Sequence, residues 1–561
     1  MKNKYYEGQK LNDYKELVAL YKNKYSNHIA FEYKTSPDST EHINITYSQF
    51  ASDIEALASS LLSLNLKRVC LISPNRYEWF VSYLAVTTSN LVIVPLDKSL
   101  PDNEIINLIK RSECDAIIYD NKYENAILES KKQISNLMTI NMDSNYKELL
   151  TNGYKIDHSN YNNIQIDNKK MTIMLFTSGT TSVSKAVMLN QEAICNDLYA
   201  LSQMIKITPS DTFLSFLPLH HTFESTTTFL FGTSCGITIA ICDGLKYIQK
   251  NLIEYKITGF VCVPLMLEIM YKKIVKGIEK QHKTVIVQIM RKLFRHFPIS
   301  VKRKVFKSIL DNFGGELKTI VTGGAAMDQD TLKGYNDFGF DIHQGYGLTE
   351  TSPVIAGENS FKKKLGSCGL PLPTIDIKID NPDKDGIGEI IVNTPTIMLG
   401  YYKNVQATDE VIIDGWFHTG DLGYMDNDGY LFITGRKKDM IVLKNGKKIF
   451  PEEVESLINK LPYVSESMVF GFTQNNKNDR NSDVVLYAKI VYNKDELQKL
   501  VSDESEYYNY IYSDIKTKIN KQMPAYKYIR KIIITDIPLI KTTTQKIKRN
   551  EEIKLITKDL L

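Results

Sequence analysis

The chain has 561 residues, of which 43% are hydrophobic and 24% charged, and its formal net charge is +4. This length is more than one hydrophobic core usually serves, and the composition is that of a soluble globular protein, so we expect two or three domains. The seven cysteines include no CxxC pair, the N-terminus lacks the apolar stretch of a signal peptide, and no run of about 18 apolar residues occurs. We therefore expect a cytoplasmic protein that is neither secreted nor integral to a membrane and has no nucleic-acid partner.

Short apolar runs alternate with amphipathic segments such as 53–64 through the first three quarters of the chain. The runs lie at residues 68–73, 91–97, 115–120, 237–242 and 258–264. This alternation predicts an α/β protein with largely buried strands. The pattern changes after the turn sequence DNDG at 426–429, where a basic cluster precedes a helix that begins at Pro451. We expect a domain boundary here, with one domain over 1–436 and a second over 437–561.

The stretch LFTSGTTSVSKAVMLN at 175–190 contains six hydroxyl side chains around one glycine and then Lys185. Hydroxyls and turn amides donate hydrogen bonds, and a lysine supplies a point charge, so the stretch suits a phosphate group. It is not a Walker loop, because G-x-x-x-x-G-K-[ST] is absent. Taken alone, such a run is more often a polar surface loop.

Further motifs follow the phosphate-like loop in a fixed order along the chain. They are LPLHHTFE at 217–224, TGGAAM at 322–327, QGYGLTET at 344–351, GEIIV at 388–392, GWFHTGDLGYMDNDGYLFITGRKKDMI at 415–441 and KTTTQKIKR at 541–549. The set resembles the adenylate-forming superfamily of acyl-CoA synthetases, luciferases and peptide-synthetase adenylation domains. The resemblance implies a large N-terminal α/β domain of mixed sheets with flanking helices, followed by a small, mobile α+β C-terminal domain.

The resemblance implies a nucleotide site that binds ATP with Mg²⁺. The residues that it assigns to ATP are Thr177, Ser178, Gly179, Thr180, Thr181, Lys185, Gly324, Ala325, Ala326, Gln344, Gly345, Tyr346, Gly347, Thr349, Asp421 and Arg436. The first six hold the phosphates and pyrophosphate, and Gly324, Ala325, Ala326 and Tyr346 frame the adenine. Asp421 binds the ribose hydroxyls with help from Arg436, and Thr177 and Glu350 lie near the metal ion.

The resemblance also implies a two-step reaction in which His221, Glu350 and Lys546 are catalytic. A carboxylate attacks the α-phosphate of ATP, and a thiol then displaces AMP from the acyl-adenylate. Lys546 and Mg²⁺ would neutralise the charge between the two anions. His221 would lie beside the carboxylate pocket, although an isolated histidine is more often structural. Lys438 falls at the family's hinge, and a solvated turn is an equally compatible reading.

The chain departs from the family pattern at Ser182, Ser184, Ala186 and Gln545. A replaced glycine that needed positive φ would cost about 1–3 kcal/mol of local strain. We still expect an active enzyme.

Residues 75–86 and 217–224 resemble the long-chain fatty acyl branch of the family. The expected function is therefore that of an AMP-forming fatty acyl-CoA ligase that uses a fatty acid, ATP and coenzyme A. Two alternatives stay open: a fatty acyl-AMP ligase that loads a separate acyl carrier protein, and a non-catalytic nucleotide- or lipid-binding relative.

The segment 271–310 is unusually basic, with nine lysines, three arginines and a single acid, Glu279. Ile286, Met290, Leu293 and Phe297 recur at helical spacing, and Pro298 separates this helix from the next. A solvated helical face is the usual reading of such a charge run. We expect instead that the segment contacts an anionic surface, either phospholipid at the membrane periphery or an acidic carrier protein.

Overall fold

The computed structural model describes residues 5–177, 184–443, 446–473, 484–542 and 546–560. The chain forms two compact units, the first made of residues 1–377 and 392–417 and the second of 378–391 and 418–561. The expected boundary between 436 and 437 lies within the second unit and stays a prediction. Within the described part of the chain, no helix has both the length and the apolar character needed to cross a membrane.

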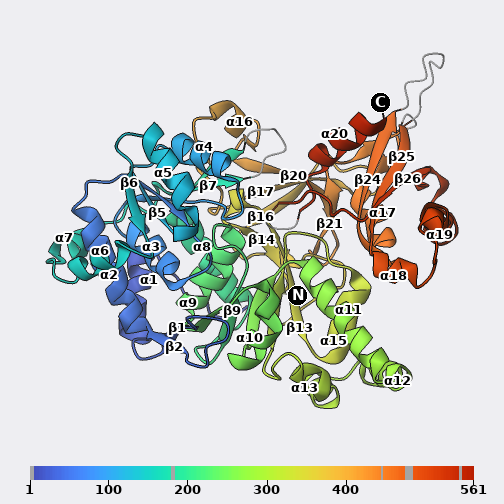
Figure 1. Ribbon diagram of the computed structural model, residues 1–561, viewed down its shortest axis with the longest axis horizontal. Coiled ribbons are helices and arrows are strands. Elements are labelled where there is room, and N and C mark those ends of the chain that lie inside the picture. Colours follow the sequence, from blue (N-terminus) through green and yellow to red (C-terminus); the bar gives the residue numbers. More distant parts are fainter. Residues whose placement is uncertain (1–4, 178–183, 444–445, 474–483, 543–545, 561) are drawn as a thin grey trace. The chain divides into compact units, whose positions relative to one another are not determined.

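The first unit contains two mixed sheets (Figure 1). The seven-stranded sheet has the order β18 (Gly400–Tyr401), β8 (Lys185–Asn190), β7 (Met171–Thr177), β4 (Val92–Pro95), β3 (Arg68–Ile72), β5 (Ala116–Tyr119) and β6 (Met138–Asn141). The nine-stranded sheet has the order β15 (Leu370–Pro371), β14 (Val354–Gly357), β13 (Asp341–Gly347), β12 (Thr319–Thr322), β11 (Gly259–Cys262), β9 (Thr212–Ser215), β10 (Thr238–Ile241), β1 (Ile29–Tyr33) and β2 (Ile43–Thr46). The strands predicted from the five apolar runs are β3, β4, β5, β10 and β11, so this part of the sequence prediction is confirmed.

Helices connect these strands and cover them. The α-helices of the first unit are α1 (Tyr14–Lys24), α2 (Tyr47–Leu62), α3 (Tyr77–Thr87), α4 (Asp102–Ser112), α5 (Glu124–Gln133), α6 (Tyr146–Gly153), α7 (Ser159–Asn163), α8 (Gln191–Met204), α9 (Gly232–Ser234), α10 (Ile248–Glu254), α11 (Pro264–Lys280), α12 (Thr284–Phe294), α13 (Ile299–Val305), α14 (Lys307–Asp311), α15 (Gln329–Phe338) and α16 (Val405–Asp409). Shorter or wider turns are η1 (Asn121–Tyr123), the π-helical η2 (Phe223–Phe231), η3 (Leu245–Tyr247) and η4 (Thr349–Thr351).

Helix α2 illustrates how the sequence determines these elements. The side chain of Thr46 caps its N-terminus by accepting a hydrogen bond from the backbone N–H of Gln49. Apolar residues at helical spacing, Phe50, Ile54 and Leu57, are fully buried. The amphipathic segment predicted over 53–64 is the C-terminal part of this helix.

The second unit is α+β. The chain passes between the two units within one sheet, and β19 (Ile412–Ile413) of this sheet belongs to the first unit. The strands of the sheet are β16 (Asp376–Asp380), β17 (Gly388–Asn393), β20 (Trp416–Met425), β19 and β21 (Leu431–Arg436). It is followed by the pair β22 (Ile441–Val442) and β23 (Lys448–Ile449) and by the three-stranded sheet β24 (Val464–Thr473), β25 (Val484–Tyr492) and β26 (Lys531–Thr535). The helices and turns are α17 (Pro451–Ile458), α18 (Lys494–Gln498), η5 (Glu504–Glu506), α19 (Tyr507–Asp514), η6 (Ile515–Ile519), η7 (Asn520–Gln522), η8 (Ala525–Lys527) and α20 (Arg549–Leu560). A large α/β unit and a smaller α+β unit are the fold class predicted from the sequence.

Candidate functional site

The hairpin of β7 and β8 carries both ends of the predicted phosphate loop. Thr177 and Lys185 face each other in register, and the Thr177 hydroxyl donates to the Lys185 carbonyl at 3.4 Å. The Nζ atom of Lys185 lies 4.6 Å from the centre of the Tyr401 ring. Ser178, Gly179, Thr180 and Thr181 lie outside the described residues, so their assignment stays a prediction.

Two of the four departures from the family pattern have a visible structural setting. Arg111 of α4 donates to the Ser184 hydroxyl at 3.0 Å and to the Ser184 carbonyl at 2.6 Å. Ala186 is buried in the core of the seven-stranded sheet. Neither residue has positive φ, so the strain considered for replaced glycines does not arise at these positions. Ser182 and Gln545 lie outside the described residues.

Tyr401 links the residues that were assigned to phosphate and to metal. Its hydroxyl donates to Glu350 Oε1 at 3.0 Å, while its ring lies against Lys185. Burial, together with the charge of Glu350, raises the pKa of Tyr401, so the phenol stays protonated and remains a donor. Contacts therefore run from Thr177 through Lys185 and Tyr401 to Glu350. No motif in the sequence marks Tyr401, because only the pairing of β18 with β8 places it here.

The two motifs assigned to adenine lie side by side. Strands β12 and β13 are parallel neighbours with Thr322 opposite Gln344, so both motifs lie at the carboxyl ends of their strands. A Cβ atom added to Gly323 would lie 3.0 Å from the carbonyl oxygen of Gly345, which shows how closely the two backbones approach.

The assigned residues in these motifs differ in exposure and in their contacts. Gly324, with φ of +84°, Ala325 and Ala326 form an exposed loop, whereas Tyr346 is largely buried. The side-chain amide of Gln344 donates to the Ser367 carbonyl at 3.2 Å. A Cβ atom on Gly345 would meet only the Ala356 carbonyl oxygen, at 3.6 Å, whereas on Gly347 it would lie 1.8 Å from the Pro353 carbonyl oxygen, so position 347 admits only glycine. Thr349 is the first residue of η4.

His221 lies in a mostly buried polar region between β9 and η2. Its carbonyl accepts hydrogen bonds from the backbone and the hydroxyl of Ser225, and its ring centre is 4.4 Å from that of His220. Burial, with a smaller effect of Lys98, lowers the pKa of His220 to about 3, so that ring is neutral.

Glu224 of the same region was not singled out in the sequence, although it belongs to the 217–224 motif. It is fully buried and accepts hydrogen bonds from Ser215 Oγ at 2.7 Å and Thr228 Oγ1 at 2.9 Å. Burial raises the pKa of Glu224 to about 8, although the two hydrogen bonds act to lower it. The glutamic acid is therefore mostly protonated at neutral pH.

In the second unit, Asp421 and Arg436 form an ion pair across the β20–β21 hairpin. The two residues are opposite in register, and Arg436 Nε lies 2.8 Å from Asp421 Oδ1. Asp421 is only 4% exposed. A carboxylate can accept hydrogen bonds from hydroxyl groups as well as from a guanidinium. The structure thus brings together the two residues assigned to the ribose.

Lys546 is exposed, and ion pairs hold the described residues on either side of it. Thr542 and Lys546 exchange hydrogen bonds, from Thr542 N–H to the Lys546 carbonyl at 2.8 Å and from Lys546 N–H to Thr542 Oγ1 at 3.1 Å. On one side Lys541 pairs with Glu466 at 2.5 Å, and on the other Arg549 pairs with Glu455 at 2.6 Å. Sequence analysis missed these anchoring residues, because their partners lie far away in the chain.

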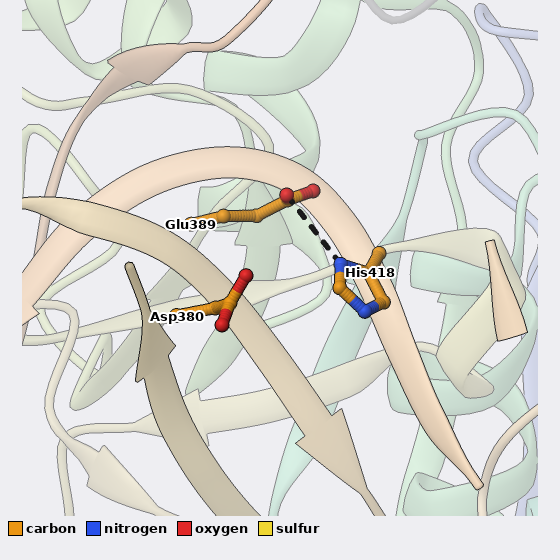
Figure 2. Close-up of side chains that lie close together, drawn as sticks. All are labelled: Asp380, Glu389 and His418. Carbon is orange, nitrogen blue, oxygen red and sulfur yellow. Dashed lines mark ion pairs between the residues drawn. The ribbon is translucent and has the colours of Figure 1, made fainter. Parts of the chain in front are cut away.

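The turn after β21 contains Lys438, the residue assigned to the hinge, which is exposed. Its neighbour Lys437 pairs with Glu389 Oε2 at 2.8 Å, and His418 Nδ1 lies 3.4 Å from the same oxygen. Figure 2 shows Glu389 and His418 beside Asp380, an arrangement with the donor types of a metal site. Gly420 N–H donates to the other oxygen of Glu389, so Lys437 and this amide already satisfy the carboxylate. We read the cluster as an internal charge network.

Both units match one family of known proteins. The sequence pattern of the AMP-binding enzyme family matches residues 19–402, and that of the AMP-binding enzyme C-terminal domain matches residues 438–559. The chain belongs to the AMP-binding enzyme family. The predicted resemblance to adenylate-forming enzymes is confirmed.

Among curated members of the family, one similar protein is the chloroplastic long-chain-fatty-acid–[acyl-carrier-protein] ligase AEE15 of Arabidopsis thaliana. It is 26% identical over 602 aligned positions, which cover 91% of this chain and 81% of that protein. The long-chain-fatty-acid–CoA ligase FadD15 of Mycobacterium bovis is 27% identical, over 76% of this chain and 75% of FadD15.

Solved structures of adenylate-forming enzymes show the same fold. ATP-bound MatB from Rhodopseudomonas palustris has a TM-score of 0.76 at 21% identity and covers 98% of this chain and 99% of MatB. The o-succinylbenzoate coenzyme A synthetase MenE of Bacillus subtilis, solved with ATP and magnesium ion, has a TM-score of 0.70 at 22% identity, over 95% and 98% of the two chains. The predicted fold class, a large α/β domain and a smaller C-terminal domain, is confirmed.

Proposed function

We propose that this protein is an AMP-forming fatty acyl-CoA ligase. In the first step a fatty acid carboxylate attacks the α-phosphate of ATP, so that acyl-AMP forms and pyrophosphate leaves. In the second step the thiol of coenzyme A attacks the acyl carbon, the acyl–phosphate bond breaks, and AMP leaves. The proposal takes the long-chain fatty acid as substrate from the two curated relatives.

The contact sequence Lys185–Tyr401–Glu350 is the observation that carries the proposal. It holds a cation and a carboxylate, the two charge types that a metal–triphosphate complex requires, through one shared side chain. The Thr177 hydroxyl and the Glu350 carboxylate are oxygen ligands of the kind that Mg²⁺ prefers, and Tyr401 occupies only one of the two carboxylate oxygens. A bound Mg²⁺ would neutralise phosphate charge there.

The remaining assigned residues have roles that fit their settings. Lys185 would bind the phosphates, and Gly324, Ala325 and Ala326 would contact adenine through an exposed loop. Asp421 would accept hydrogen bonds from the ribose hydroxyls, and Lys546 would neutralise the oxygens at the reacting phosphate. His221 would contact the carboxylate of the acid.

A lid that reorients at Lys438 after the first step would carry Lys546 away and admit the thiol. We propose 437–561 as that lid. Its boundary with 1–436 lies at the turn that follows β21.

One observation supports a second acceptor. AEE15, which aligns with 91% of this chain, is named as a ligase for an acyl carrier protein. An acyl carrier protein is therefore the alternative to coenzyme A. A non-catalytic relative is disfavoured, because Ser184 and Ala186 fit without backbone strain and Arg111 supports Ser184.

The experiment is an acceptor comparison across a panel of acids. The purified protein is incubated with Mg²⁺, ATP and acetate, medium-chain or long-chain fatty acids, with coenzyme A or holo-acyl carrier protein, and pyrophosphate and thioester are measured. We expect pyrophosphate release with long-chain acids and thioester formation with coenzyme A. Thioester on the carrier protein alone would establish the alternative, and no pyrophosphate with any acid would refute the proposal.

A further inference from the structure

Helix α12 has an exposed apolar side. The exposed fractions are 68% for Val285, 60% for Ile286, 60% for Ile289 and 64% for Leu293. These positions repeat at three- and four-residue intervals, so they lie on one side of the helix. The apolar surface continues beyond the helix to Phe297, which is also exposed. We call these five residues the α12 apolar face.

The opposite side of α12 attaches the helix to the first unit. Val287 and Met290 pack against the core formed around β11, β12 and α15. Arg291 and Arg295 both pair with the buried Asp337 of α15, at 3.1 and 3.2 Å. In Figure 1, α12 lies at the edge of this unit beyond α15. The helix is therefore held in a defined orientation by one side while the other side faces outward.

The structure refines the expectation that the whole basic segment offers its charge to a partner. Arg291 and Arg295 balance Asp337, and Arg303 donates to the carbonyls of Leu317 and Gly315, so these guanidinium groups support the fold. Several other lysines of the segment are exposed. Those nearest the α12 apolar face in the sequence include Lys280, Lys283, Lys292 and Lys304.

We propose that the α12 apolar face inserts into the interface of an anionic phospholipid membrane, with the surrounding lysines over the headgroups. Charge complementarity supports this occupant, because the exposed lysines Lys280, Lys283, Lys292 and Lys304 flank the apolar face. Cations alone would suit any acidic partner. Outward-pointing aliphatic side chains beside lysines additionally require an apolar layer beneath a negative surface, which a lipid interface supplies. The inference does not depend on the reaction proposed above.

The experiment is co-sedimentation of the purified protein with phosphatidylcholine vesicles that contain or lack phosphatidylglycerol. Binding is measured at ionic strengths of about 0.1 M and about 1 M, where the Debye length is about 10 and 3 Å. We expect binding to the anionic vesicles at low salt only. The triple variant Ile286→Gln, Ile289→Gln, Leu293→Gln and the double variant Lys283→Gln, Lys292→Gln should each lower the partition coefficient about tenfold or more.

Matched controls carry the same changes elsewhere on the first unit. Leu128, Leu245 and Ile253 are aliphatic residues exposed by 50–65%, which suits a triple glutamine variant, and Lys155 and Lys169 are exposed lysines for the double variant. Both controls should bind like the parent. Equal loss in a control and its α12 counterpart would overturn the proposal, as would binding of an acidic carrier protein without binding of vesicles.

A fluorescence measurement separates insertion from adsorption. The chain has only two tryptophans, and one of them, Trp79, is buried, so Leu293→Trp introduces a reporter on the α12 apolar face. The fluorescence emission of the introduced tryptophan should shift to shorter wavelength when anionic vesicles are added. Vesicle binding without this shift would contradict insertion of α12.

Discussion

Removing one hydroxyl, in Tyr401→Phe, tests the proposed metal and phosphate contacts of the first unit. The lost hydrogen bond joins the Tyr401 hydroxyl to Glu350 Oε1 at 3.0 Å. Hydrogen bonds to charged groups contribute about 1.5–3 kcal/mol, and Glu350 is only partly buried, so the lower end applies. A loss of about 1.5 kcal/mol corresponds to roughly tenfold in an equilibrium or rate constant. We therefore expect the Mg²⁺ concentration for half-maximal pyrophosphate release to rise about tenfold, because Glu350 is less well positioned.

The next residue provides the matched control. The Tyr402 hydroxyl donates to the half-exposed Glu113 at 2.9 Å, so Tyr402→Phe removes a similar bond outside the proposed site. Tyr401→Ala also removes the ring beside Lys185 and with it a cation–π contact of about 0.5–1 kcal/mol. We therefore expect the KM for ATP to be about two- to fivefold higher in Tyr401→Ala than in Tyr401→Phe. The assay is pyrophosphate release with Mg²⁺ and ATP varied in turn. Indistinguishable Mg²⁺ dependence in Tyr401→Phe and Tyr402→Phe would refute the role assigned to Tyr401.

Three further predictions concern stability and the two half-reactions. Folding raises the pKa of Glu224 from 4.5 to about 8. Between these pH values the folded protein keeps a proton on Glu224 that the unfolded chain releases. The contribution of Glu224 to stability is therefore complete below pH 4.5 and falls as the pH rises toward 8. Relative to the parent, Glu224→Gln should therefore gain roughly 1.4 kcal/mol of unfolding free energy per pH unit across this window in urea titrations, and a constant difference would contradict the protonated state. Lys546→Ala should slow acyl-adenylate formation far more than thioester formation from supplied acyl-adenylate, and equal losses would remove the assigned role. Lys438→Pro should impair thioester formation more than adenylation when the two are timed separately, whereas unchanged kinetics would exclude a hinge at this position.

Sequence predicted the contacts whose partners share a local pattern. Asp421 and Arg436 stand on the two strands of one hairpin, so their motif already implies proximity. The motifs around Gly324 and Gln344 follow neighbouring parallel strands of an α/β sheet, whose carboxyl ends meet at one edge. The expectation that these residues act together comes from the resemblance to the adenylate-forming family, which assigns Asp421 and Arg436 to the ribose and the two glycine-containing motifs to the adenine.

Contacts between distant segments could not be predicted in this way. Tyr401 reaches Glu350 only because β18 pairs with β8, and no feature of its own short strand indicates that pairing. Glu224 stands in a recognised motif, but its protonation depends on burial by elements from elsewhere in the chain. Arg291 and Arg295 belong to a basic run in the sequence, and nothing in that run indicates their shared partner Asp337, which lies on another helix.

The proposed function requires that this protein makes a fatty acyl-adenylate and transfers the acyl group to a thiol. The most direct measurement is mass spectrometry of the products formed from ATP, Mg²⁺ and a long-chain fatty acid, first without and then with coenzyme A. We expect fatty acyl-AMP and pyrophosphate in the first reaction, and fatty acyl-CoA and AMP in the second. Formation of ADP and phosphate, or no acyl-AMP with any acid of the panel, would contradict it.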